Sequence, residues 1–157
     1  MEYNIREIKN TEYPALDDFL YEAIFIPKGQ LPLERNIIHL PELQVYVADF
    51  GKKKDDLCLV AEVNDKLIGA VWSRVMNDYG HIEDGVPSLA ISLYQEYRGH
   101  GIGTALMKRM IQELKRRGYK KTSLSVQKSN YAVEMYLNLG FEIIDESEEE
   151  YIMIYNL

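Results

Sequence analysis

Three glycines in alternate positions stand near the middle of the chain, directly after a short apolar segment. The stretch reads, in order, Arg98, Gly99, His100, Gly101, Ile102, Gly103 and Thr104. Glycine permits positive φ and lets the main chain approach a ligand closely, and the first turn of a helix offers unpaired N–H groups at the positive end of its dipole. The pattern is therefore typical of a corner that binds phosphate, and Arg98 adds a forked cation suited to phosphate oxygens.

Two well-known phosphate-binding patterns do not fit this stretch. The pattern G-x-x-x-x-G-K-[ST] is absent, because no Lys-Ser or Lys-Thr pair follows the glycines. The dinucleotide pattern G-x-G-x-x-G/A also fails, because its last position is Thr104 counted from Gly99 and Leu106 counted from Gly101. The alternative is a turn that serves only the packing of a strand against a helix, but three glycines beside Arg98 and a basic helix favour ligand binding.

The segments around the turn predict the elements that hold it in place. Leu89 to Tyr94 is expected to form a strand, and residues 102–117 an amphipathic helix that ends at Gly118. The other expected elements are a strand over 3–8, a helix from Thr11, a helix over 42–50, strands over 57–63 and 67–74, a strand over 122–127, a helix over 130–139, and strands over 141–145 and 151–155. Antiparallel hairpins combined with two strand-helix-strand crossovers imply a mixed sheet with helices on its faces.

The run from Arg98 to Gly103 resembles the R/Q-x-x-G-x-G/A signature of the GNAT acyltransferase superfamily, whose members bind the pyrophosphate of acetyl-CoA at this turn. A second segment is similar too: Asn130, Tyr136 and the run 139–141 look like the family's second motif, in which an Asn faces the pantetheine arm and a Tyr stands near the thioester sulfur. The resemblance implies an α/β fold of mixed α+β type, with a central mixed, mostly antiparallel sheet of about seven strands and about four helices on its faces, in one N-acetyltransferase domain over 1–157.

The resemblance also implies acetyl-CoA as co-substrate and a parting of the strands 89–94 and 122–127, between which pantetheine would bind. Parted strands expose N–H and C=O groups that an amide-bearing ligand can satisfy. The cofactor-binding residues implied in this way are Leu93, Tyr94, Arg98, Gly99, His100, Gly101, Ile102, Gly103, Thr104 and Asn130. A backbone N–H near Leu93 or Tyr94 is expected to polarise the thioester carbonyl.

Direct attack of a primary amine on the thioester needs an acid for the departing thiolate and a base for the amine. Tyr136 is the candidate acid, because a phenol with a pKa near 10 stays protonated at neutral pH; without the resemblance it would be an aromatic core residue. Glu83 is the first candidate base and His81 the second, with a solvated loop position as the alternative for each. Cys58 lies in an apolar strand and is expected to be buried and structural.

The charge of the chain is unevenly distributed. The formal net charge is −7, which argues against general nucleic-acid binding. Residues 98–121 nevertheless hold eight Lys or Arg and one acid, Glu113, so the remainder carries −14. One segment therefore suits an anionic cofactor, while the rest suits a cationic acceptor, a small-molecule or peptide amine that the N-terminal helices and the loop 77–87 are expected to line.

Composition sets wider bounds. A chain of 157 residues suits one domain, and its single cysteine allows no intramolecular disulfide. No run approaches the ~18 uninterrupted apolar residues of a membrane-spanning helix, and the N-terminus lacks a secretion-signal pattern, so a cytoplasmic protein without membrane partners is expected. His39 and His100 have no metal-ligand spacing, so no metal is expected. A homodimer, a non-catalytic acyl-CoA-binding module and a nucleotide-binding regulatory module stay open at this point.

Overall fold

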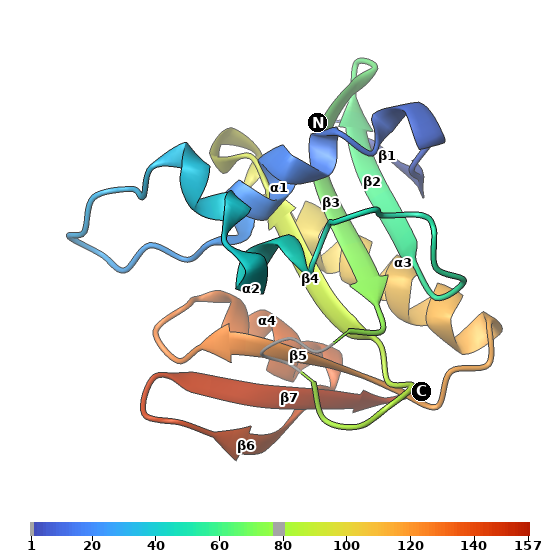
Figure 1. Cartoon of the computed structure of the whole chain (residues 1–157), viewed down its shortest axis with the longest axis vertical. Coiled ribbons are helices and arrows are strands. Elements are labelled where there is room, and N and C mark those ends of the chain that lie inside the picture. The colour runs from blue at the N-terminus through green and yellow to red at the C-terminus, as the bar shows by residue number, and fades with distance from the viewer. Residues whose placement is uncertain (1, 77–80) are drawn as a thin grey trace.

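A seven-stranded sheet runs through the molecule in the order β1-β2-β3-β4-β5-β7-β6 (Figure 1). The computed structural model describes residues 2–76 and 81–157. The strands are β1 (Asn4–Glu7), β2 (Leu57–Val63), β3 (Lys66–Arg74), β4 (Ser88–Leu93), β5 (Lys121–Gln127), β6 (Glu142–Glu146) and β7 (Glu150–Asn156). All neighbouring pairs are antiparallel except β4 and β5, which are parallel. The expected mixed, mostly antiparallel sheet is therefore confirmed.

Helices cover both faces of the sheet. Among the described residues the α-helices are α1 (Ala15–Ala23), α2 (Pro41–Gln44), α3 (Ile102–Arg116) and α4 (Ala132–Leu139), and the 3-10 helices are η1 (Asn10–Glu12), η2 (Arg35–His39) and η3 (Gln95–Tyr97). Alternate residues of β2 enter two separate cores, Leu59 with α3 and Val60 with α1. The two layers therefore sandwich the sheet, with α1 and α2 on one face and α3 and α4 on the other (Figure 1). None of the described helices has the length and apolar character needed to cross a membrane.

The hairpin between β2 and β3 follows its sequence prediction closely. Asn64 and Asp65 form the connection and both have positive φ, at 50° and 64°. Two-residue hairpin loops favour this backbone conformation because its twist matches that of the flanking strands, and Asn and Asp tolerate it better than other residues with a Cβ. The local sequence therefore sets the pairing of Val63 with Lys66 at the start of the β2–β3 ladder.

The helix expected over 42–50 is wrong beyond its first turn. α2 ends at Gln44, and the chain continues to Phe50 as turns. Tertiary hydrogen bonds take the carbonyls that a longer helix would use: Arg74 donates to the carbonyls of Val45 and Ala48 at 3.1 and 2.7 Å, and the Trp72 indole donates to that of Tyr46 at 3.1 Å. The segment is thus shaped by β3, which lies far from it in sequence.

The helix expected from Thr11 also starts later than the sequence indicates. Residues 10–12 form a separate 3-10 turn, and α1 begins at Ala15. The Glu12 carboxylate accepts two hydrogen bonds from Arg6 of β1 at 2.8 Å and one from the Lys9 N–H at 2.8 Å. These bonds hold the turn against the strand and separate it from α1.

Candidate functional site

β4 and β5 part immediately after they meet. Their only ladder pair is Ser88 with Ser123, at the N-terminal ends of both strands. The carbonyl of Pro87 closes this end, because it accepts hydrogen bonds from the Ser123 N–H at 3.1 Å and from the Thr122 hydroxyl at 2.8 Å. Beyond this point the two strands share no register, so the parting that the resemblance implied is confirmed. We call the resulting opening the splay.

The edge of β4 that faces the splay carries unpaired main-chain groups. The Tyr94 N–H donates to the Ile68 carbonyl of β3 at 3.0 Å. Because every second residue of an antiparallel strand bonds the same neighbour, the N–H groups of Leu93 and Ile91 point the other way, into the splay. Of the two N–H groups that the sequence nominated to polarise a carbonyl, the Tyr94 N–H is therefore excluded and the Leu93 N–H is retained.

The glycine turn lies between the open end of β4 and the start of α3. Gly99 and Gly101 have φ of 79° and 82°, in the left-handed region, and a Cβ at either position would meet no atom within 4 Å. The first intrahelical bond of α3 runs from the Ala105 N–H to the Gly101 carbonyl at 3.1 Å, so the N–H groups of residues 102–104 have no partner within the helix. The turn is open at Gly99 and Gly101, next to these groups, as suits an anion site at a helix N-terminus.

Arg98 does not extend toward the turn that it precedes. Its Nε donates to the Leu93 carbonyl at 3.0 Å, and its Nη2 donates to the main-chain carbonyl and a carboxylate oxygen of Glu22, each at 3.3 Å. The direct phosphate contact expected from the sequence is therefore not the arrangement in this structure. The guanidinium instead ties the end of β4 to the end of α1.

Tyr136 projects from α4 into the core beneath the sheet. Its side chain is 7 % exposed and its ring lies 5.8 Å from that of Phe141, centroid to centroid. Burial raises the pKa of this phenol above its usual value, because the charged form would lose its hydration. The hydroxyl is thus protonated throughout the neutral range, and its burial also fits the core position that the residue would have without a catalytic role. Asn130 stands just before the helix, where its Oδ1 accepts a hydrogen bond from the Ala132 N–H at 2.9 Å.

The candidate bases lie at the closed end of the splay. Glu83 forms an ion pair with Lys121, the first residue of β5, and its side chain is 52 % exposed. The His81 Nδ1 lies 3.1 Å from the Met76 carbonyl and its Nε2 lies 3.9 Å from the Asp84 carboxylate. Both residues therefore approach from the side opposite the glycine turn. Residues 77–80 of the loop that was expected to line the acceptor site lie outside the described residues.

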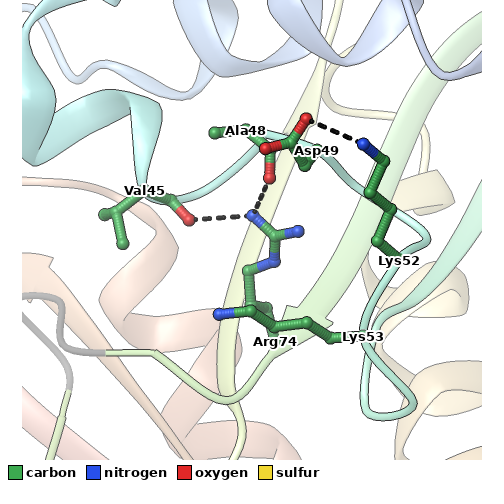
Figure 2. Close-up of a pocket in the computed structure, with 6 residues that line it drawn as sticks. All are labelled: Val45, Ala48, Asp49, Lys52, Lys53 and Arg74. Carbon is green, nitrogen blue, oxygen red and sulfur yellow. Dashed lines mark hydrogen bonds and ion pairs between the residues drawn. The ribbon is translucent and has the colours of Figure 1, made fainter.

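A surface hollow at the end of β3 is structural in character. Its lining is formed by Val45, Ala48, Asp49, Lys52, Lys53 and Arg74 (Figure 2). Arg74 makes a two-pronged ion pair with Asp56 at 2.9 Å, and the two side chains are 3 % and 0 % exposed. Burial acts to raise the pKa of Asp56, but hydrogen bonds from Arg74 and from the Gly51 and Lys53 N–H groups outweigh it and lower that pKa. The groups of the hollow thus bond to one another and secure the 45–56 segment.

The comparison with protein families decides the family. The sequence model of the acetyltransferase (GNAT) family matches residues 10–141, which include the glycine turn, both parted strands and α4. The chain belongs to the GNAT acetyltransferase family. The resemblance seen in the sequence is thereby confirmed, and the GNAT family places this chain among transferases.

Individual relatives of this GNAT chain agree with the assignment. An acetyltransferase of Pectobacterium atrosepticum is 39 % identical over 91 residues, which cover 57 % of this chain and 60 % of that protein, so the match spans less than two thirds of the relative's length. The PaiA N-acetyltransferase of Thermoplasma acidophilum, solved in complex with coenzyme A, matches with a TM-score of 0.69 and 19 % identity over 100 % of both chains. The putative acetyltransferase YncA of Salmonella typhimurium, solved with acetyl-CoA, matches with a TM-score of 0.69 and 17 % identity over 99 % of this chain and 94 % of that one. At these identities the two structures show the shared fold.

One residue next to the candidate site was not identified from the sequence. Gly69 of β3 pairs with Leu93 of β4, and a Cβ at Gly69 would lie 2.0 Å from the Leu93 Cδ2 and 3.0 Å from the Ser92 carbonyl oxygen. Gly69 therefore makes room for the side chain of the residue whose N–H faces the splay. A glycine inside an apolar strand is itself a signal of close approach, and it was available in the sequence.

Proposed function

We propose that this chain transfers the acetyl group of acetyl-CoA to the nitrogen of a primary amine. The observation that carries the proposal is the open glycine turn, with Gly99 and Gly101 at positive φ, next to a strand whose N–H groups face a splay. The turn suits a diphosphate, and the splay suits a chain of amides. Coenzyme A carries both groups in that order, with the thioester at the far end of the amide chain.

The proposed reaction is a single displacement. The amine nitrogen attacks the thioester carbonyl carbon, and the carbon–sulfur bond breaks as the carbon–nitrogen bond forms. The Leu93 N–H donates to the carbonyl oxygen as negative charge develops there. Tyr136 gives its proton to the departing thiolate, and a base takes the proton that the amine loses. Glu83 is the first candidate for this base and His81 the second, because both approach the closed end of the splay.

A covalent acyl-enzyme is not part of the proposal. Cys58 is the single cysteine of the chain, and its side chain is 1 % exposed. Burial, with smaller contributions from Glu12 and Glu7, raises the pKa of this thiol, so the reactive thiolate is disfavoured. This cysteine therefore supports direct attack over a two-step route.

The acceptor is proposed to be a cationic amine of a small molecule or peptide. The cationic residues concentrate in 98–121, around the cofactor turn and α3, and the rest of the chain carries an excess of acids. An acidic surface raises the local concentration of ammonium groups. Neutral amines would then be poorer substrates at equal concentration, and the preference would weaken as salt is added.

The experiment that tests the proposal measures free thiol release from acetyl-CoA with a panel of amines that includes polyamines, amino acids and lysine-containing peptides. Thermal melting with CoA, ATP and NAD is run in parallel, because a ligand of the folded state raises the melting temperature. Amine-dependent thiol release together with stabilisation by CoA is the expected result. Stabilisation by CoA without amine-dependent release would refute the enzyme proposal in favour of a binding module, and stabilisation by ATP or NAD alone would indicate a nucleotide-binding regulator.

A further inference from the structure

Arg98 joins three parts of the molecule through one planar group. The guanidinium bonds the Leu93 carbonyl at the end of β4 at 3.0 Å, and it bonds both the main chain and the carboxylate of Glu22, just inside the end of α1, at 3.3 Å. The Arg98 backbone leads directly into Gly99 of the glycine turn. The splayed strand, the cofactor turn and α1 are therefore fixed relative to one another at a single side chain.

Glu22 determines where the charge of Arg98 resides. The two side chains are 34 % and 27 % exposed, so water screens their attraction less than it screens a fully exposed pair. A guanidinium presents its N–H donors in a rigid fork, which allows it to reach a strand carbonyl and a carboxylate at once; an ammonium group has no such fixed geometry. The pair holds the guanidinium on protein atoms and away from the open side of the turn.

α1 is also tied to β4 next to this pair. The Ser92 hydroxyl donates to the Phe19 carbonyl at 2.7 Å, and the rings of Phe19 and Tyr94 lie 5.2 Å apart. These contacts align α1 along β4 on the face opposite α3, and the Arg98–Glu22 pair adds the tie next to the glycine turn. α1 belongs to the N-terminal helices that are expected to line the acceptor side, and on that expectation the pair lies between the two substrate sites.

We infer that Glu22 is a positioning residue for the cofactor turn. By holding Arg98 on the Leu93 carbonyl, Glu22 fixes the entry to the turn, and with it the directions of the N–H groups of residues 102–104 that receive the diphosphate. The inference rests on the proposed function, because it takes the anion at the turn to be the diphosphate of coenzyme A. It reverses the role that the sequence suggested for Arg98: the side chain orders the phosphate site and does not itself bind phosphate.

The direction in which loss of the Glu22 charge changes CoA affinity distinguishes positioning of the turn from direct phosphate contact by Arg98. Glu22→Gln keeps the size of the side chain and removes its charge. If Glu22 positions the turn, this variant binds CoA about two- to fivefold more weakly by calorimetry, the effect of losing a partly exposed ion pair. If Arg98 contacts the diphosphate directly, removal of its counter-charge frees Arg98 and CoA binds more tightly. Tighter or unchanged binding would overturn the inference.

Asp17→Asn is the matched control. It removes one negative charge from the same helix at an exposed position for which the structure shows no ion pair among the described residues. A change in CoA affinity that arises from net charge alone would appear in both variants, whereas the positioning effect appears only in Glu22→Gln. Thermal melting of both variants establishes that they are folded.

Arg98 variants give a second, independent measurement. For a positioning role, Arg98→Lys and Arg98→Gln weaken CoA binding to a similar extent, and the slope of log Kd against log salt stays that of the wild type, because no phosphate contact is lost. At saturating acetyl-CoA, kcat of Glu22→Gln stays within about twofold of wild type while KM for acetyl-CoA rises. A shallower salt slope in Arg98→Gln, with affinity largely rescued in Arg98→Lys, would refute positioning.

Binding by the wild-type protein distinguishes the two proposals. If the wild type does not bind CoA by calorimetry, the proposed function fails and the inference fails with it. If the wild type binds CoA and the Kd of Glu22→Gln for CoA is equal to or lower than that of the wild type, only the inference fails. Calorimetry needs no acceptor, so the outcome does not depend on identifying the amine.

Discussion

Gly101→Ala tests whether the backbone of the glycine turn, and no side chain, binds the cofactor. Gly101 has φ of 82°, and an added Cβ would meet no atom within 4 Å, so the substitution adds no clash and only strains the backbone. A residue with a Cβ in this conformation costs about 1–2 kcal/mol. The strain is relieved by rotating the peptide groups that lead into α3, which turns their N–H groups away from the diphosphate. Loss of one charge-assisted hydrogen bond corresponds to about 10- to 100-fold weaker binding of CoA.

Gly118→Ala, at the other end of α3, is the control. Gly118 has φ of 90° and is likewise free of neighbours within 4 Å of an added Cβ, so the two substitutions carry the same conformational cost. Both variants should lower the melting temperature by about 2–8 °C. Only Gly101→Ala should weaken CoA binding, measured by calorimetry at a temperature where both variants are folded. Equal CoA affinity in the two variants would refute the assignment of the diphosphate to this turn.

The remaining predictions concern the splay, the proton donor and the buried ion pair. Gly69→Ala places a Cβ 2.0 Å from the Leu93 Cδ2, so Leu93 must move. We expect the free energy of unfolding, measured in urea, to fall by about 1–3 kcal/mol and the KM for acetyl-CoA to rise. An unchanged KM would show that the position of Leu93 does not affect acetyl-CoA binding. Tyr136→Phe should lower kcat by about 10²-fold or more and leave the Kd for CoA intact; wild-type turnover in this variant would exclude Tyr136 as the acid. Asp56→Asn leaves Arg74 buried without its counter-charge, which we expect to cost about 3–5 kcal/mol in urea unfolding. Because folding lowers the pKa of Asp56, the contribution of Asp56 to the free energy of unfolding is fully present above the unfolded-state pKa of ~3.9 and is lost as the pH falls through the lower folded-state value. The wild type should therefore lose more stability than Asp56→Asn between about pH 5 and pH 2. Parallel acid-unfolding curves of the two proteins would contradict this.

Most elements near the site follow their sequence predictions because their signals are local. The bounds of β4, α3 and β5 agree with the expected ranges to within one residue at each end. Alternating or helical spacing of apolar residues and a terminating glycine act over a few residues, so the sequence carries them directly. The segment 42–50 differs from its predicted helix because its carbonyls accept hydrogen bonds from Arg74 and Trp72. No pattern within the segment indicates those partners.

The site residues divide in the same way. The glycine turn could be predicted because positive φ is favoured by glycine itself. The protonated state of Tyr136 could be predicted from the ordinary pKa of a phenol, and the structure adds that burial raises this pKa. The role of Arg98 could not be predicted from the sequence, because its partner Glu22 lies 76 positions earlier. The ion pair of Glu83 with Lys121 likewise joins residues on opposite sides of α3 in the chain.

By itself the sequence determined a helix that begins at a glycine-rich corner after an apolar strand, and this corner carried much of the resemblance to the GNAT acyltransferase superfamily. Only the tertiary structure decided which main-chain groups of β4 are free, which way Arg98 points, and which end of the splay is closed. The physical reason is that backbone preferences are set by neighbouring residues, whereas the partner of a charged side chain is set by packing between segments that meet only after the sheet has formed.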